Sequence, residues 1–139
     1  MRRFFAGLIF VLLGISSVHA EEERTLFGVW ATRGDGAHVL IHRCEDGKLV
    51  CGSIVWTASG KPDRIGASIL TGFAFEDGRL RGGRIIDPRS GSRYRARLEM
   101  IDEGLLKVEG CVLIFCGDQE WTRVPDEIAG RDLMRDAEG

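Results

Sequence analysis

The side chains best suited to chemistry in this chain are two histidines, His38 and His42, and one carboxylate, Asp87, that lies near Tyr94. Two histidines four residues apart chelate a metal ion when they lie on a helix. The apolar residues between them indicate a strand instead, and four residues of strand span about 13 Å, which is too far for one ion. We therefore predict no metal site and no cofactor.

Asp87 opens the sequence Asp-Pro-x-x-Gly, which is typical of a tight turn because Asp caps the turn and Pro presets φ. The enzymatic alternative is a hydrolase centred on Asp87 and Tyr94. The serines lack the Gly-x-Ser-x-Gly context of a nucleophile elbow, and no set of nucleophile, base and acid stands out. The sequence therefore predicts a turn at Asp87 and a protein that is not an enzyme.

The first 20 residues have the pattern of a Sec-type signal peptide. Arg2 and Arg3 precede an apolar stretch, residues 4–15, that is too short to span a bilayer. Small residues then lead to Ala20, which suits cleavage by signal peptidase. We expect cleavage after Ala20 and a periplasmic or secreted protein that begins at Glu21 and has no stable membrane anchor.

The charge of the mature chain argues against nucleic acid as a partner. Removing Arg2 and Arg3 from the 19 basic residues leaves 17 against 21 acidic residues, a net charge of −4. A domain that binds nucleic acid typically carries a basic patch and the opposite net charge.

The four cysteines, Cys44, Cys51, Cys111 and Cys116, form an even set in a chain expected to be exported, which indicates two disulfides. Of the three possible connectivities we favour the local pairs 44–51 and 111–116, each contributing about 2–3 kcal/mol on the chain-entropy model. A zinc site is the alternative, but zinc knuckles use a tighter C-x2-C spacing. Because residues 111 and 116 of one straight strand would lie about 16 Å apart, their bond requires residues 112–115 to fold back.

Turn signals rich in Asp and Gly recur about every ten residues from Gly28 to Val124, with short runs of alternating apolar and polar residues between them. The pattern predicts eight strands, over residues 27–32, 37–43, 49–56, 69–75, 79–86, 92–101, 105–112 and 119–124. Their short connections indicate an all-β, antiparallel up-and-down barrel, in which closure removes exposed strand edges. We expect the barrel domain to span residues 21–124, followed by a C-terminal helix or tail over residues 125–139.

Several segments in a fixed order carry a family likeness: residues 28–32 (GVWAT), Cys44, residues 51–56 (CGSIVW), residues 83–91 (GRIIDPRSG) and residues 121–124 (WTRV). Together they resemble a bacterial family called domain of unknown function 2147. The resemblance covers about residues 27–124 and implies an exported, lipocalin-like small β-barrel. It implies no catalytic residues, because the family has no established activity.

Gly28-Val29-Trp30 near the first strand, together with Arg123 on the last, also resembles the Gly-x-Trp motif and the arginine of lipocalins. This resemblance implies that the guanidinium of Arg123 packs over Trp30, joins the first and last strands and closes the barrel floor. A contact between Arg123 and a ligand is the alternative.

An eight-stranded barrel can hold one small ligand, and three tryptophans suit either the lining of an apolar cavity or the filling of a core. Our leading hypothesis is a periplasmic, non-enzymatic binder of a small hydrophobic ligand. The candidate ligand-binding residues are Trp30, Trp56, Tyr94, Ile114, Phe115, Trp121 and Arg123.

The alternative hypothesis is a protein-interaction module. One strand face carries Arg93, Arg95 and Arg97, which either attract an anionic partner or simply keep the barrel exterior solvated. The apolar residues 112–115 form a lid over the barrel mouth, an outward docking site for a partner or membrane surface, or a plain continuation of the strand.

Overall fold

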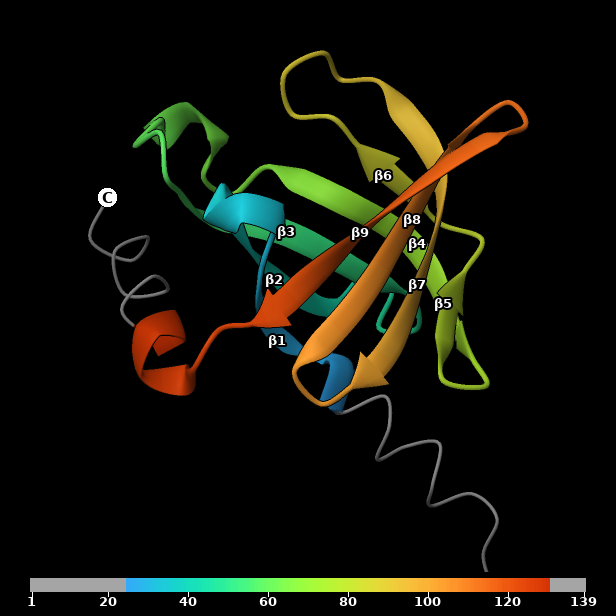
Figure 1. Cartoon of the computed structure of the whole chain (residues 1–139), viewed down its shortest axis with the longest axis horizontal. Helices are drawn as coiled ribbons and strands as arrows, with labels where there is room; N and C mark the ends of the chain where they lie inside the picture. Colours follow the sequence, from blue (N-terminus) through green and yellow to red (C-terminus); the bar gives the residue numbers. More distant parts are fainter. Residues whose placement is uncertain (1–24, 131–139) are drawn as a thin grey trace, which may run out of the picture.

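The computed structural model describes residues 25–130, which form a β-barrel (Figure 1). Its strands are β1 (Gly28–Ala31), β2 (Ala37–Arg43), β3 (Val50–Thr57), β4 (Ser68–Glu76), β5 (Arg79–Arg81), β6 (Arg84–Ile86), β7 (Arg93–Asp102), β8 (Leu105–Val112) and β9 (Phe115–Arg123). Short 3-10 helices, η1 (Arg33–Asp35) and η2 (Pro62–Arg64), lie in the β1–β2 and β3–β4 loops. The expected signal peptide, residues 1–20, lies outside the described residues.

The sheet closes into an eight-stranded antiparallel barrel of up-and-down topology. β9 pairs with β1, and β3 pairs with β4, so the ends of the sheet meet. β5 and β6 both lie between β4 and β7 and are therefore two halves of one interrupted strand. The all-β barrel expected from the alternation of apolar and polar residues is confirmed.

The single strand predicted over residues 79–86 is interrupted at Gly82 and Gly83. Gly82 has a φ of +78°, in the left-handed region that breaks a strand. A Cβ at Gly83 would lie only 2.4 Å from the ring of Phe73. The ring of Phe73, which is fully buried, therefore occupies the space that a side chain at position 83 would need.

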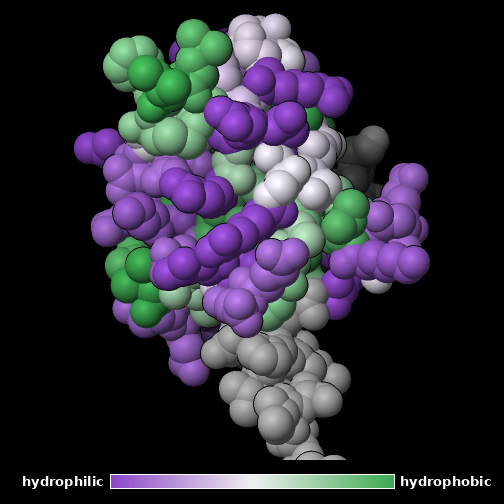
Figure 2. Space-filling model, turned by 90° about the vertical axis from the view of Figure 1, so that its right-hand side faces the viewer, coloured by the Kyte–Doolittle hydropathy of each residue, from purple (hydrophilic) through white to green (hydrophobic). Residues whose placement is uncertain are grey.

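The barrel interior is filled from its floor upward by side chains that alternate along the strands, as the period of two requires. Trp30, Phe73 and Trp121 are its largest fully buried side chains, and branched aliphatic residues surround them. The outer surface is mostly hydrophilic on the face shown in Figure 2, where hydrophobic side chains gather mainly near the upper edge.

A second apolar cluster lies outside the barrel. Residues 126–130 are helical, and Ala129 of this helix packs with Val29, Ala31, Val55 and Val124. A C-terminal helix is therefore present in the described part of the expected range 125–139, while residues 131–139 lie beyond it.

Arg123 and Trp30 close one end of the barrel. The guanidinium carbon of Arg123 lies 4.1 Å from the ring centroid of Trp30, so the packing that the lipocalin resemblance implies is confirmed. The indole N–H of Trp30 donates to the carbonyl oxygen of Leu26 at 2.9 Å. Arg123 also donates to three backbone carbonyl oxygens, those of Thr25, Phe27 and Glu103.

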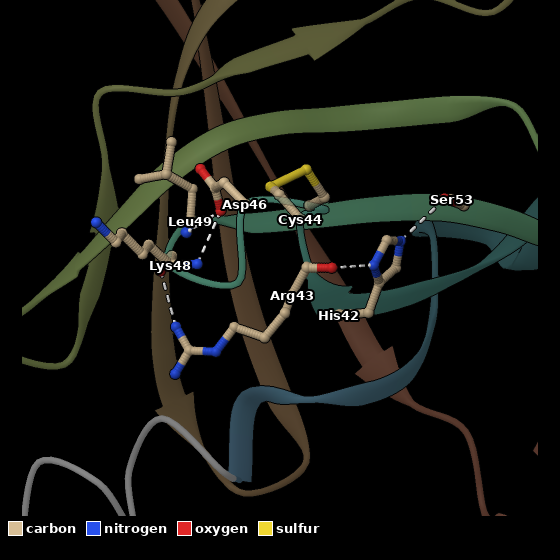
Figure 3. The surroundings of a disulfide bond; sticks show 8 residues. His42, Arg43, Cys44, Asp46, Lys48, Leu49 and Ser53 are labelled. Carbon is tan, nitrogen blue, oxygen red and sulfur yellow. Dashed lines mark hydrogen bonds between the residues drawn. A yellow bond between two sulfur atoms is a disulfide. The ribbon is translucent and has the colours of Figure 1, made fainter.

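The Cys44–Cys51 disulfide, one of the two that we favoured, lies at this closed end, with Cα atoms 5.0 Å apart (Figure 3). In the enclosed turn, the carboxylate of Asp46 accepts the backbone N–H groups of Leu49 at 2.9 Å and Lys48 at 2.8 Å. Both hydrogen bonds lower the pKa of Asp46 because they stabilise its ionised form, and the one from Leu49 has the larger effect.

The second favoured disulfide, Cys111–Cys116, corrects the predicted start of the last strand. Cys111 and Cys116 are direct cross-strand partners with Cα atoms 4.0 Å apart, so β9 begins at Phe115 rather than at residue 119. Residues 112–115 fold back as the tip of the β8–β9 hairpin, as this disulfide requires. The alternative in which one strand runs on through Phe115 is wrong.

Candidate ligand-binding site

A cavity of about 850 Å³ lies at the open end of the barrel, opposite Arg123 and Trp30. Its mouth is framed by the β1–β2 loop, the β6–β7 loop and the base of the β8–β9 hairpin (Figure 1). The volume lies within the range of small-molecule sites. The walls are apolar side chains from several strands: Ala37, Ile54, Ile69, Ile85, Val108 and Trp121.

The rim of this cavity is polar and carries both signs of charge. Its basic residues are Arg33 and Arg89, and its acidic residues are Asp87 and Asp118. The lining also includes Tyr94 and Gln119. A cavity that is apolar in depth and polar at its mouth suits an amphipathic small molecule whose apolar part enters first.

Two glycines keep the cavity wall between β8 and β9 free of side chains. Gly110 and Gly117 are cross-strand partners that both line the cavity. A Cβ at Gly117 would meet no atom within 4 Å, and one at Gly110 would meet only a methyl group of Ile85, at 3.7 Å. Neither glycine has a positive φ, so these residues provide space and are not required by the backbone conformation.

Trp121 carries a buried polar group without a partner. Its side chain is 1% exposed, and no atom of residues 25–130 accepts a hydrogen bond from its indole N–H. Trp30 is equally buried, but its indole N–H is paired with Leu26. A buried, unpaired N–H costs about 1–3 kcal/mol, so a molecule that brings an acceptor to Trp121 would offset that cost.

The chain matches the model of a family described as "Uncharacterized protein conserved in bacteria (DUF2147)" over residues 28–123. The chain belongs to this family. The matched range runs from the first residue of β1 to the last residue of β9, so the family model covers the complete barrel.

The barrel is similar in structure to protein HP1028 from the human pathogen Helicobacter pylori, which belongs to the lipocalin family. The TM-score is 0.61 at 16% sequence identity, and the likeness covers 77% of this chain and 88% of that chain. At this identity it establishes a lipocalin-like fold for our DUF2147 chain and leaves the ligand open. No curated protein shows significant sequence similarity.

In this DUF2147 barrel the candidate ligand-binding residues are distributed over several places. Tyr94 and Trp121 line the cavity. Trp30 and Arg123 lie together at the closed end. Trp56 lies on the outer face of the barrel, where its ring centroid is 4.5 Å from that of His38.

The outward position of Trp56 has a local cause. His38 pairs with Trp56 while Val39 pairs with Ile54, so Val55 is an extra residue that forms a β-bulge. The bulge reverses the alternation after Ile54 and turns Trp56 away from the interior. The three tryptophans therefore do not form one site.

Ile114 and Phe115 lie at the tip of the β8–β9 hairpin, beyond the cavity lining. Their side chains are 87% and 75% exposed, so the tip does not tuck into the barrel mouth as a lid. Of the alternatives for residues 112–115, an outward apolar tip describes the structure.

Asp87 forms the expected turn at the cavity mouth. Its carboxylate accepts the backbone N–H of Arg89 at 2.8 Å, and its own N–H donates to the carbonyl oxygen of Ser92 at 2.9 Å. The hydrogen bond from Arg89 lowers the pKa of Asp87. Tyr94 lines the same cavity, but the carboxylate of Asp87 is engaged in the turn.

Gly117 and Gln119 of the cavity lining were missed by the sequence analysis. They share the inward face of β9 with Trp121, so counting back in steps of two from Trp121 identifies them once β9 is extended to Phe115. Arg33 lies in η1 and Arg89 in the β6–β7 loop, where no strand periodicity indicates which way a side chain points.

Within residues 25–130, one group of potential metal ligands comes together, Glu109 with Cys111 and Cys116. The two sulfur atoms are bonded to each other, so neither is the thiolate that a metal site needs. His38 and His42 both lie on strand β2, and His42 is within 3.1 Å of the hydroxyl of Ser53. Among the described residues, no helix is long and apolar enough to cross a bilayer.

Proposed function

We propose that this DUF2147 protein is an exported, periplasmic binder of a small, largely apolar ligand that carries a hydrogen-bond acceptor. The observation that carries the proposal is the cavity of about 850 Å³, whose apolar walls include the side chain of Trp121. The indole N–H of this same side chain is buried and unpaired among the described residues. The apolar part of the ligand would lie against Ile54, Ile69 and Ile85, and its acceptor would lie on Trp121. The polar rim would face the ligand's more hydrophilic end or water.

Export is supported by two independent features. Residues 1–20 have the charge, apolar length and small-residue ending of a signal peptide. All four cysteines are paired in disulfides, which persist in oxidising compartments such as the periplasm.

A role in binding rather than catalysis is supported by the state of Asp87. Its lowered pKa keeps the carboxylate ionised at neutral pH, far from the poised pKa of a general acid or base. The carboxylate also holds the turn through the N–H of Arg89. The carboxylate of Asp87 therefore has a structural role, and substituting it would change the conformation of the loop at the cavity mouth.

The direct test is native mass spectrometry of the protein purified from its own periplasm. We expect a mass increment from a retained small molecule, which organic solvent should extract and high-resolution mass spectrometry should identify. A protein that repeatedly carries no such molecule, and that binds no apolar probe, would contradict the proposal.

A cavity-filling variant, Gly117→Phe, locates the site. A Cβ at Gly117 would meet no atom within 4 Å and its cross-strand partner Gly110 has no side chain, so we expect the barrel to accommodate the ring and fold as before. We expect it to abolish the fluorescence increase of N-phenyl-1-naphthylamine that the unchanged protein produces. The matched control is Glu120→Phe, which adds the same ring to the exposed outer face of β9 and should leave probe binding intact.

Trp121→Phe tests the hydrogen bond separately. The ring remains, but the N–H is lost, so a purely apolar probe should bind nearly as before. The natural ligand should bind about fivefold to a hundredfold more weakly, because a hydrogen bond in a dry site is worth roughly 1–3 kcal/mol. If Trp121→Phe bound the natural ligand as tightly as the unchanged protein does, Trp121 would make no hydrogen bond to the ligand.

A further inference from the structure

The tip of the β8–β9 hairpin exposes a continuous apolar segment. Four of the six exposed large hydrophobic residues in the described chain lie there in sequence: Val112, Leu113, Ile114 and Phe115. Scattered exposed hydrophobic residues are ordinary, but a contiguous group marks a surface that contacts something else.

The conformation of the tip is not one that folding alone favours. Leu113 is at the turn with a φ of +55°, in the left-handed region where glycine or asparagine is usual and leucine is costly. A two-residue hairpin turn normally carries Gly, Asn or Asp. This chain places a leucine there with its side chain 79% exposed, so neither burial nor turn geometry accounts for the residue.

The tip projects from the barrel as a stapled unit. The first residues of β9 pair with β8 alone, because β1 pairs only with Thr122 and Arg123 at the other end of the strand. The Cys111–Cys116 disulfide joins the two strands directly below the tip. This cross-link restricts the conformations of an overhanging hairpin that the barrel core does not hold.

A basic hollow lies on the outer face of the barrel beside the tip. It encloses about 320 Å³, and its lining includes Arg84, Arg95, Arg97 and Cys111. Arg95 connects hollow and tip, since its Nη2 donates to the carbonyl oxygen of Leu113 at 3.0 Å. Figure 2 shows hydrophobic side chains at the upper edge of one face directly above a band of hydrophilic ones.

Most of the arginines near this hollow have no salt-bridge partner among the described residues. Arg97 is paired with Glu109, and Arg79 with Glu99. Over residues 25–130, no carboxylate lies within salt-bridge distance of four other arginines of this region, Arg81, Arg84, Arg93 and Arg95. The apolar tip is therefore flanked by uncompensated positive charge.

We propose that the hairpin tip docks this protein reversibly on an anionic phospholipid surface. Residues 112–115 enter the boundary between headgroups and acyl chains, and the guanidinium groups of Arg84 and Arg95 bind a lipid phosphate in the hollow. An apolar insertion combined with adjacent basic residues is the pairing that peripheral membrane binding requires. A protruding tip reaches into a bilayer without a complementary groove, and its arginines select for negative headgroups. Docking does not depend on whether the cavity is occupied.

The test is cosedimentation of the mature protein with vesicles of equal parts phosphatidylglycerol and phosphatidylethanolamine, compared with vesicles of phosphatidylcholine alone. We expect binding to the anionic vesicles that weakens as salt is raised, and much weaker binding to the neutral ones. Failure to bind anionic vesicles, or equal binding to both kinds, would overturn the proposal; in the first case a protein partner for the tip would replace it.

The sharpest variant is Leu113→Gly. It removes an exposed apolar side chain and relieves a left-handed backbone conformation, so the thermal midpoint should stay the same or rise. Vesicle affinity should fall about tenfold, in line with loss of one buried leucine side chain. A purely structural tip predicts no loss of vesicle binding in this variant.

Two further variants separate insertion from charge. Ile114→Asp with Phe115→Ser should abolish vesicle binding without lowering the thermal midpoint, since both side chains are exposed. Arg84→Gln with Arg95→Gln should reduce affinity for anionic vesicles about tenfold or more. The matched control is Ile101→Asp, which places a charge on an exposed apolar residue at the closed end of the barrel and should leave vesicle binding unchanged. Tip variants that bind as well as the unchanged protein would refute the docking site.

Discussion

Replacing Arg123 with methionine tests how the closed end of the barrel is held. Arg123 packs over Trp30 and donates to backbone carbonyl oxygens on the N-terminal segment and on the β7–β8 turn. Burial lowers the pKa of Arg123, but the guanidinium stays charged at neutral pH. Methionine can still cover the indole ring while it removes both the charge and the hydrogen-bond donors.

The expected loss follows from these contacts. The two part-buried hydrogen bonds, to Thr25 and Phe27, contribute about 1.5 kcal/mol each, and the cation–π contact adds about 1 kcal/mol. The exposed hydrogen bond to Glu103 adds little. Because water partly replaces the lost donors, we expect the free energy of unfolding to fall by about 2–4 kcal/mol. For a domain of this size the thermal midpoint should drop by roughly 6–20 °C.

Urea unfolding followed by circular dichroism, with disulfides intact, measures this loss. Arg93→Met on the outer face of β7 is the matched control and should change the free energy of unfolding by less than about 0.5 kcal/mol. Arg123→Lys keeps the charge without the planar fork and should lie between the two. A loss below about 1 kcal/mol in Arg123→Met would refute this account. Loss of cavity-probe binding at unchanged stability would instead support a ligand contact by Arg123.

Three other predictions concern single positions. Gly83→Ala should destabilise the barrel by about 1–3 kcal/mol in urea unfolding, since its Cβ would lie 2.4 Å from the ring of Phe73, whereas Gly117→Ala should be nearly neutral. The lowered pKa of Asp46 means that its carboxylate stabilises the folded state above its usual pKa of about 3.9, a contribution lost as pH falls through the lower folded-state value. When the pH is lowered from about 6 to about 2, the thermal midpoint of Asp46→Asn should therefore fall less than that of the unchanged protein. An identical fall in the two proteins would count against this assignment. The intact mass of the secreted protein should correspond to a chain that begins at Glu21, and a retained Met1 would show that no cleavage occurs.

The barrel was predictable because its determinants are local. Strand alternation, turn residues and two short-range cysteine pairs all depend on residues within about ten positions of one another. The barrel and both disulfides agree with the structure, while the interruption at Gly82 and Gly83 and the start of β9 differ from the prediction. The Gly-x-Trp segment and Arg123 lie far apart in sequence, so only the resemblance to lipocalins indicated that they meet.

The site was less predictable because it depends on features with no sequence period. The bulge at Val55 adds one residue to β3 and moves Trp56 from the interior to the exterior. The space beside Gly110 and Gly117 reflects missing side chains, which carry no hydrophobic signal. The start of β9 was placed too late because the exposed, apolar residues 112–115 do not resemble a turn. A turn rich in Leu, Ile and Phe contradicts the usual composition of hairpin tips.

Three departures from what folding alone favours lie toward the open end of this barrel. At the floor, the indole N–H of Trp30 is paired and Arg123 satisfies several carbonyl groups. Toward the open end, the indole N–H of Trp121 in the apolar depth of the cavity is unpaired, Gly117 leaves space unfilled in the cavity wall, and Leu113 at the exposed hairpin tip has a costly positive φ. Proteins accept such violations mainly where function requires them. Gly117→Phe and Leu113→Gly remove two of them, and each should preserve or raise stability while it removes one kind of binding. Substitutions toward the open end would then reduce binding without reducing stability, whereas substitution of Arg123 at the floor would reduce stability. A barrel whose open end had no function would show no loss of binding in the first group of variants.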